Sequence, residues 1–201
     1  MNKILIFDLS EVLILGLKNV EDIISNTTGI SKKEIMNSLY NDNLYSYFIG
    51  ETTEKYYIEE LISKNKWKNI KNDDLKNIFR KNFNNRIPGM ISLIESLKRK
   101  HQLVLLSDHG QEWIEYIIKT HPFLSYFNNR YFSFDLHHLK QEDITYKIVL
   151  KKLNCSPTDC VFIDDFPKNI EIAKSCGIYA IQFFGKDKLI FELMKNGIDF
   201  S

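Results

Sequence analysis

The stretch Val161-Phe162-Ile163-Asp164-Asp165 is a short apolar run that ends in two adjacent carboxylates. Two other runs have the same form, since residues 4–7 are followed by Asp8 and residues 103–106 by Ser107. Runs of Ile, Leu, Val and Phe of this length are typical of strands buried on both faces of a parallel sheet. Ligands bind just beyond the carboxyl ends of such strands. We therefore expect these acids and this hydroxyl at one edge of a sheet, where they suit a metal ion and a phosphate.

Strands and helices alternate along much of the chain, which predicts an α/β fold with a doubly wound, Rossmann-like parallel sheet. After the first strand, the second is predicted to end at Leu106, and others to cover residues 130–134, 161–163 and 179–184. Helices are predicted at residues 90–97, 111–119, 144–153 and 189–196. A further helix is expected between Pro167, which suits a first helical turn, and Gly177, which suits a helix end.

Between the first strand and Pro88-Gly89, the apolar residues follow helical spacing and no strand is evident. Ser31, with Glu34 three residues later, matches a capping box at the start of one of these helices. The pattern predicts a helical insertion of residues 17–87 in a core made of residues 1–16 and 88–201.

The composition is ordinary for a soluble globular protein, with 26% charged residues, 44% hydrophobic residues and a formal net charge of +1. This balance gives no reason to expect a nucleic acid or a membrane surface as a partner. No segment approaches the roughly 20 apolar residues of a membrane span, and Asp8 and Glu11 interrupt the only apolar run near the N-terminus. The cysteines Cys155, Cys160 and Cys176 have no ligand-like spacing and are expected as buried, reduced thiols. These features predict a cytoplasmic protein and leave its oligomeric state open.

Four motifs resemble, in their order, those of the haloacid dehalogenase (HAD) superfamily, most of whose members are magnesium-dependent phosphatases. The resemblance runs from Asp8 to about Gly177, and it depends on the joint order of the motifs because each alone is weak. The motifs are Phe7-Asp8-Leu9-Ser10-Glu11-Val12-Leu13; Leu106-Ser107-Asp108; Phe132-Ser133-Phe134-Asp135-Leu136 with Lys140 and then Tyr146; and Phe162-Ile163-Asp164-Asp165 with Asn169, Ala173 and Gly177. In this family an insertion after the first motif is a cap that closes over the active site, so residues 17–87 are expected to form an α-helical cap domain.

The resemblance implies a hydrolase that removes phosphate from a small phosphorylated molecule. Asp8 would be the nucleophile, which attacks phosphorus and divides one difficult step into two through an aspartyl-phosphate. Ser107 would donate its hydroxyl hydrogen to the phosphoryl oxygens, together with the backbone N–H of Asp108. Lys140 would neutralise the charge that builds up on the transferring group.

The same resemblance implies a Mg²⁺ site, since magnesium prefers oxygen ligands. Asp8, Asp165 and the backbone carbonyl of Ser10 would be direct ligands. Asp164 would act through a water molecule or from behind the ligands, and Asn169, one helical turn further on, would orient these groups. Two adjacent carboxylates repel each other unless a cation lies between them and Asp8, which is consistent with this arrangement.

Several positions depart from the family pattern and bear on turnover. Ser10 stands where many family phosphatases have a second Asp, which protonates the leaving oxygen and then activates water. Losing general acid–base catalysis typically costs about 10²–10⁴-fold in rate. Asp108 replaces a frequent Asn and adds negative charge near the phosphate, and His137 and Gln141 replace a common Gly and Pro.

These departures leave two alternatives to a phosphatase open. One is haloacid dehalogenation at Asp8, which uses no metal and fits poorly with the Asp164-Asp165 pair. The other is a phosphate-binding or regulatory protein that keeps the fold with little turnover, as Ser10 and Asp108 would allow. The His137-His138 pair is compatible with a general acid, but a solvated surface feature is the commoner explanation. A further group of aromatic residues, Tyr45, Tyr47 and Phe48, suits either helix packing or stacking on a substrate.

Overall fold

The protein folds around a parallel five-stranded sheet with the strand order β3-β2-β1-β4-β5, in a computed structural model that describes residues 3–199. The strands are β1 (Ile4–Phe7), β2 (Gln102–Ser107), β3 (Asn129–Phe132), β4 (Cys160–Asp164) and β5 (Tyr179–Gln182). All four pairings between neighbouring strands are parallel. The doubly wound α/β sheet predicted from the sequence is therefore confirmed.

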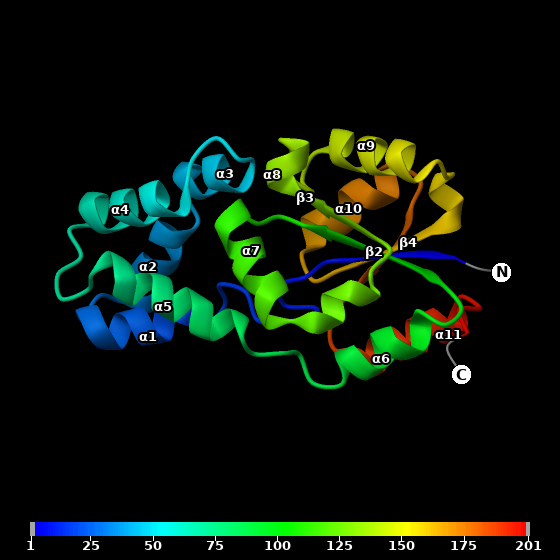
Figure 1. The fold of residues 1–201 in the computed structure, drawn as a ribbon, viewed down its shortest axis with the longest axis horizontal. Helices are drawn as coiled ribbons and strands as arrows, with labels where there is room; N and C mark the ends of the chain where they lie inside the picture. The colour runs from blue at the N-terminus through cyan, green and yellow to red at the C-terminus, as the bar shows by residue number, and fades with distance from the viewer. Residues whose placement is uncertain (1–2, 200–201) are drawn as a thin grey trace.

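Helices cover both faces of this sheet. Alternate strand residues point to opposite faces, and both faces carry apolar side chains that the helices bury. On one face, Leu5 and Phe7 share a hydrophobic cluster with helices α6 (Met90–Leu97), α7 (Gln111–Thr120) and α11 (Lys186–Lys195). On the other face, Ile6 and Phe162 belong to a second cluster with helices α9 (Asp143–Leu153) and α10 (Pro167–Ser175). Figure 1 shows the sheet between these two helical layers.

The register of the central strands brings their carboxyl ends to one level. Phe7 of β1 pairs with Leu105 of β2 and with Ile163 of β4. Asp8, which follows Phe7, donates its backbone N–H to the carbonyl oxygen of Ile163 at 2.9 Å. Asp8 and Asp164 therefore lie side by side at the carboxyl ends of the adjacent strands β1 and β4, where the apolar runs predicted them.

Between β1 and α6 the chain forms five helices and no strand, as expected. They are α1 (Val20–Thr28), α2 (Lys32–Leu39), α3 (Asp42–Phe48), α4 (Glu54–Asn65) and α5 (Asn72–Phe83). These helices pack together beyond the end of the sheet toward which β1 runs from the N-terminus (Figure 1). The predicted capping box of Ser31 and Glu34 is present at the start of α2.

The chain enters and leaves this helical insertion through two paired segments. Leu15 donates its N–H to the carbonyl of Asn85, and Ile87 donates to the carbonyl of Leu13. One hydrophobic cluster runs from the sheet into the insertion without a break. The boundaries between a core domain and a cap domain, at residues 16/17 and 87/88, stay a prediction.

Two strands end earlier than predicted. The strand expected over residues 130–134 stops at Phe132, and Ser133–Leu136 forms a short helix, α8. The hydroxyl of Ser133 donates to the carbonyl of Phe48 at 2.6 Å and accepts the N–H of His109, which ties this turn to the insertion. The last strand stops at Gln182. Two 3₁₀ turns, Pro122–Tyr126 and Pro157–Asp159, were not predicted.

Within the described residues, no helix is both long and apolar enough to cross a membrane. The three cysteines are free thiols, and Cys160 is buried whereas Cys155 and Cys176 are half-buried.

Candidate active site

The ammonium group of Lys140 lies between two carboxylates at the carboxyl ends of β1 and β4. Its Nζ is 2.6 Å from Oδ1 of Asp8 and 2.7 Å from Oδ2 of Asp164. All three side chains are buried. Burial alone would lower the pKa of Lys140, but Asp164, Asp8 and Asp108 together hold this pKa well above its usual value. The lysine is therefore a fixed positive charge, as its predicted role requires.

Asp164 is held by donors on both of its oxygens. Oδ1 accepts the backbone N–H of Phe166 at 2.7 Å, and Oδ2 accepts the Nδ2 hydrogen of Asn169 at 3.0 Å as well as the lysine. Tyr146, the residue at fixed spacing after Lys140, is buried and donates its hydroxyl to the carbonyl of Asn169. Asp164 and Asn169 thus form a rigid support behind the lysine.

The carboxylates of Asp8, Asp164 and Asp165 converge, with one oxygen of each within 4.8 Å of the others. Burial raises the pKa of Asp8 well above its usual value, and Asp164 and Asp165 raise it further, although Lys140 opposes this. Burial and Asp164 raise the pKa of Asp165 to about 6. One ammonium group does not balance this negative charge, so a divalent cation would relieve the repulsion.

The surroundings of this cluster fit a magnesium ion. Asp165 is only half-buried, and its carboxylate accepts no hydrogen bond from another side chain in residues 3–199. Asn169 has a buried Oδ1 without a hydrogen-bond partner in the same part of the chain, which suits a metal-bound water. An all-oxygen set of this kind is what magnesium prefers.

Asp108 turns its carboxylate toward the backbone of Lys140. Both of its oxygens lie 3.2 Å from the Lys140 N–H. Burial raises the pKa of Asp108 to about 6, against the opposing effect of Lys140. In this orientation the Asp108 side chain holds the backbone at Lys140 in place. The sequence suggested only that this side chain would add negative charge near the phosphate.

His109 connects the two serines of the predicted site. Its Nε2 is 2.9 Å from Oγ of Ser10, and its Nδ1 is 2.7 Å from Oγ of Ser107. Burial, helped by Lys140, lowers the pKa of His109 to about 3, so the ring is neutral at physiological pH. A neutral imidazole donates through one nitrogen and accepts through the other. The two hydroxyls therefore have opposite hydrogen-bonding roles.

His109 was not among the site residues predicted from the sequence. Ser107 is fully buried behind it, whereas His109 itself lines the cavity described below. The ring also packs against Phe48 of the insertion, with the ring centres 5.8 Å apart. Its position directly after Ser107-Asp108 was the available signal, but a single histidine beside a motif has many structural uses.

A cavity of about 330 Å³ opens between this cluster and the helical insertion. Its polar end brings together most of the residues predicted from sequence with His109, while Ser107, Asp164 and Asp165 do not line it. The lining residues at this end are Asp8, Ser10, Asp108, His109, Lys140 and Asn169. The opposite wall is mostly apolar, with Leu44, Tyr45 and Phe48 from α3.

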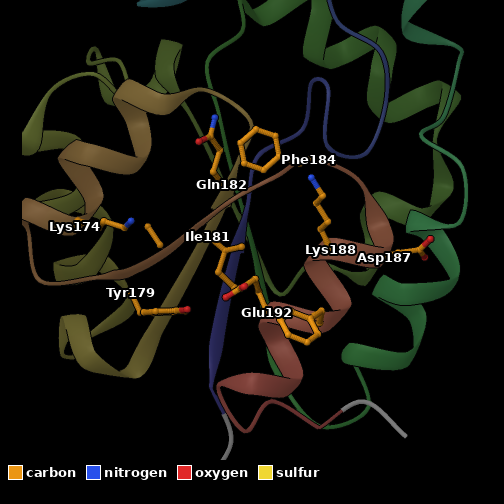
Figure 2. Close-up of a pocket in the computed structure, with 10 residues that line it drawn as sticks. Lys174, Tyr179, Ile181, Gln182, Phe184, Asp187, Lys188 and Glu192 are labelled. Atoms are coloured by element: carbon orange, nitrogen blue, oxygen red, sulfur yellow. The ribbon is translucent and has the colours of Figure 1, made fainter.

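A larger hollow of about 590 Å³ lies along β5 and α11. Figure 2 shows its lining side chains, among them Gln182, Phe184 and Lys188. None of the predicted site residues belongs to it. We call it the β5–α11 groove.

The family model described as haloacid dehalogenase-like hydrolase matches residues 5–183. The chain belongs to this family. It is accordingly a hydrolase, and the match covers all four motifs that carried the resemblance. No curated protein matches the chain in sequence.

Solved structures of HAD-like proteins share the fold. A HAD family enzyme from Bacteroides thetaiotaomicron, in complex with magnesium and inorganic phosphate, has a TM-score of 0.75 at 20% identity and covers 90% of this chain and 94% of its own. A predicted HAD-like family hydrolase from Porphyromonas gingivalis has a TM-score of 0.78 at 17% identity over 99% of both chains. L-2-haloacid dehalogenase from Xanthobacter autotrophicus, with chloropropionic acid covalently bound, has a TM-score of 0.68 at 14% identity over 99% of this chain and 85% of its own.

Proposed function

We propose that this hydrolase is a magnesium-dependent phosphatase that acts on a small phosphorylated metabolite through an aspartyl-phosphate on Asp8. The observation that carries the proposal is the buried Lys140 ammonium group between Asp8 and Asp164, at the polar end of a cavity. A phosphate dianion bound beside Asp8 needs a fixed positive charge, and the lysine provides one. The similar fold of a HAD family enzyme that binds magnesium and inorganic phosphate supports the same reading.

Asp8 would act as the nucleophile. Its Oδ1 accepts hydrogen bonds from Lys140 and from the backbone N–H of Leu9, while Oδ2 accepts none from the described residues. A carboxylate oxygen forms a bond to phosphorus as the bond from phosphorus to the alcohol oxygen breaks. Water then attacks the phosphorus of the aspartyl-phosphate, which releases inorganic phosphate and regenerates the carboxylate.

Magnesium would be held by Asp8, Asp165 and the backbone carbonyl of Ser10, with Asp164 behind them. When bound, it would supply positive charge that stabilises the phosphoryl oxygens. Asn169 would orient a water in this shell through its unpartnered Oδ1.

The phosphoryl group would also meet the loop that follows β2. Ser107 and the backbone N–H of Asp108 are the donors expected there. Because His109 covers Ser107, we assign His109 the role of fixing the direction of both serine hydroxyls. Ser10 then occupies the place of a general acid without being an effective one, so good leaving groups should react best.

Residues 17–87 would form the cap of this active site, on a core made of residues 1–16 and 88–201. The helical insertion already contributes Tyr40, Leu44, Tyr45 and Phe48 to the cavity. The pairing of residues 13–15 with 85–87 is the natural hinge for such a cap.

The test is release of inorganic phosphate from p-nitrophenyl phosphate with Mg²⁺ and with excess chelator. Magnesium-dependent release is expected, and equal release in chelator would contradict the proposal. Chloride release from 2-chloropropionate would favour the dehalogenase alternative. Binding of phosphate without turnover of any phosphate ester would favour a regulatory protein, the alternative that Ser10 supports.

A further inference from the structure

The part of the active-site cavity away from the polar end is built mostly from apolar and aromatic side chains. The insertion and the core both contribute to it. Its lining residues are Tyr40, Asn41, Leu44, Tyr45, Phe48, Leu139, Gln141 and Phe166. We call these residues the outer wall.

Three aromatic residues of the outer wall are about half exposed. Tyr40, at the end of α2, is 54% exposed, Tyr45 in α3 is 44% exposed, and Phe166, just before α10, is 47% exposed. The two tyrosines come from the insertion, whereas Phe166 directly follows the Asp164-Asp165 pair. A ligand that covers exposed rings around a cavity binds more favourably because apolar surface is removed from water. A flat aromatic ligand can also stack on these rings.

The outer wall offers no ionised side chain to a ligand. Among the cavity residues, charge is confined to Asp8, Asp108 and Lys140 at the polar end. Glu142 lies near Tyr45, but its carboxylate already accepts hydrogen bonds from the Tyr45 hydroxyl and the Leu139 N–H and pairs with His138. A second charged group on the substrate would lose hydration here and would meet no oppositely charged side chain among the residues of the outer wall.

Besides its tyrosine hydroxyls, the outer wall has two polar side chains, Asn41 and Gln141. The amide of Asn41 caps α3, since its Oδ1 accepts the Leu44 N–H and its Nδ2 donates to the carbonyl of Ser38. Gln141, which is exposed, carries the other side-chain amide of the outer wall. A polyol such as a sugar presents several hydroxyls, for which this wall has few matching groups.

We propose that the substrate is a phosphate monoester whose alcohol carries an uncharged, planar aromatic ring system. The phosphate lies at Asp8 and Lys140, and the ring lies between Phe166 of the core and Tyr45 of the insertion. This proposal rests on the phosphatase function proposed above and specifies its leaving group.

The test compares esters whose alcohols have similar acidity, so that the missing general acid at Ser10 affects them alike. Benzyl phosphate and 2-naphthylmethyl phosphate are compared with ethyl phosphate and glycerol phosphate in the presence of Mg²⁺. We expect kcat/KM to be about 10–100-fold higher for the aromatic esters, mainly through KM, as for other apolar contacts in a binding pocket.

Substitutions then locate the preference. Phe166→Leu and Tyr45→Leu remove a flat ring and keep an apolar side chain, so they should lower the ratio of kcat/KM for naphthylmethyl over ethyl phosphate by about threefold or more. The control is Phe191→Ala, which removes a ring that is 65% exposed in the β5–α11 groove and should leave the ratio unchanged.

Two kinds of failure are distinguishable. Hydrolysis of all four esters with equal kcat/KM, or a preference for glycerol phosphate, would overturn the aromatic leaving group and keep the phosphatase. A ratio that the two Leu variants leave unchanged would also overturn it. Hydrolysis of none of them, nor of p-nitrophenyl phosphate, would instead overturn the phosphatase function.

Discussion

The candidate active-site cavity and the β5–α11 groove both carry exposed aromatic rings, but they differ in whether their charged side chains are buried. In the groove, Phe184 and Phe191 are each 65% exposed. The charged lining residues Asp187 and Lys188, which Figure 2 labels, are also exposed. In the cavity, Asp8 and Lys140 are almost fully buried. The groove is the larger of the two. Buried charge, and neither volume nor exposed rings, therefore separates the candidate active site from the groove.

Burial explains why this difference is informative. A charged group at the surface keeps its hydration, so it costs almost nothing there, and pairs between exposed groups contribute about 0–1 kcal/mol. A buried carboxylate loses that hydration and must be offset by partners. Three converging carboxylates around one lysine are therefore costly unless a ligand uses them. Matched substitutions in the two hollows test this difference.

Asp8→Asn is expected to have the largest effect on activity. An amide cannot attack phosphorus, so turnover should fall by ~10⁴–10⁶-fold, the order seen when other enzymes lose their nucleophile. The measurement is phosphate release from p-nitrophenyl phosphate by a preparation free of other phosphatases. Asp187→Asn in the groove is the matched control and should keep full activity. Appreciable activity in Asp8→Asn would remove Asp8 from the nucleophile role.

Asp165→Asn and Asp164→Asn should separate metal binding from folding. No side chain of residues 3–199 donates a hydrogen bond to the Asp165 carboxylate at the cluster, so its substitution should weaken Mg²⁺ binding by about 10–100-fold, measured by titration calorimetry. Asp164 instead accepts hydrogen bonds from Lys140, Asn169 and Phe166. Its substitution should mainly lower the free energy of unfolding, by roughly 3 kcal/mol, because a buried partner of Lys140 is lost. Equal losses of Mg²⁺ affinity would contradict the assignment within the pair.

His109→Phe should lower kcat by about 10²-fold, comparable to the loss of one orienting donor in other sites. The ring keeps its packing against Phe48, while both serines lose their hydrogen-bond partner. Asn at this position places an amide near Nδ1 and should restore the Ser107 contact, whereas Gln places one near Nε2 and should restore the contact with Ser10.

The pattern of rescue shows which serine matters. Recovery by Asn alone would identify Ser107 as the serine that His109 must orient, and recovery by Gln alone would identify Ser10. If His109→Phe kept full kcat, His109 would have no positioning role. Thermal unfolding of each variant checks that the fold is kept.

The sequence predicted the sheet edge well because the signal there is local and strong. A short apolar run that ends in Asp8 or Asp164 favours a strand that ends there, and parallel strands bring such ends together. Lys140 was found only through its spacing to Tyr146 within the family resemblance. Its contacts with Asp8 and Asp164 depend on a loop whose path no local pattern shows.

The remaining features depend on contacts between distant segments. The link from His109 to Ser10 joins residues 99 positions apart. Of the three aromatic residues in α3, Tyr47 is buried against Trp113 of the core, whereas Tyr45 and Phe48 line the cavity. Helical spacing alone does not separate these roles, because it does not show which side of α3 faces the site.

Magnesium should stabilise the protein more as the pH rises. The pKa of Asp165 is raised from 3.8 to about 6 in the folded state, so folding favours the protonated form. The stability from this group is present below about pH 4 and is lost as the pH rises through about 6. Magnesium binds the deprotonated form, so at 100-fold excess over its Kd it should contribute about 2.7 kcal/mol above this window.

Thermal unfolding with and without Mg²⁺ from pH 4 to 7.5 measures this dependence. The gain in Tm should be small at pH 4 and should level off near neutrality. Asp165→Asn should remove most of it, whereas Asp187→Asn in the groove should not. A gain that is equal at all pH values would mean that the carboxylates are ionised throughout.

Ser10→Asp should give the smallest effect, and it should appear only with poor leaving groups. Ser10 cannot protonate a leaving alkoxide effectively, so rates of the unmodified protein should rise steeply with the acidity of the leaving phenol. An introduced carboxylic acid restores a proton donor. The space is narrow, however, since a Cβ atom on Gly16 would lie 2.5 Å from the Ser10 hydroxyl oxygen. We therefore expect a gain of about tenfold or less, well below the usual 10²–10⁴-fold.

A series of aryl phosphates with graded phenol pKa, run on Ser10→Asp and on Ser10→Asn, measures this gain. Asn has the shape of Asp without the acidic proton, so only Ser10→Asp should flatten the dependence on leaving-group acidity. A flat dependence in the unmodified protein would mean that another group already donates the proton or that a later step limits the rate. Single-turnover measurements separate these two explanations, because they report phosphoryl transfer to Asp8 without the later hydrolysis and release steps. Glu11 is a poor candidate for such a donor, since its carboxylate accepts the backbone N–H of Gly16 at 2.9 Å and does not line the cavity.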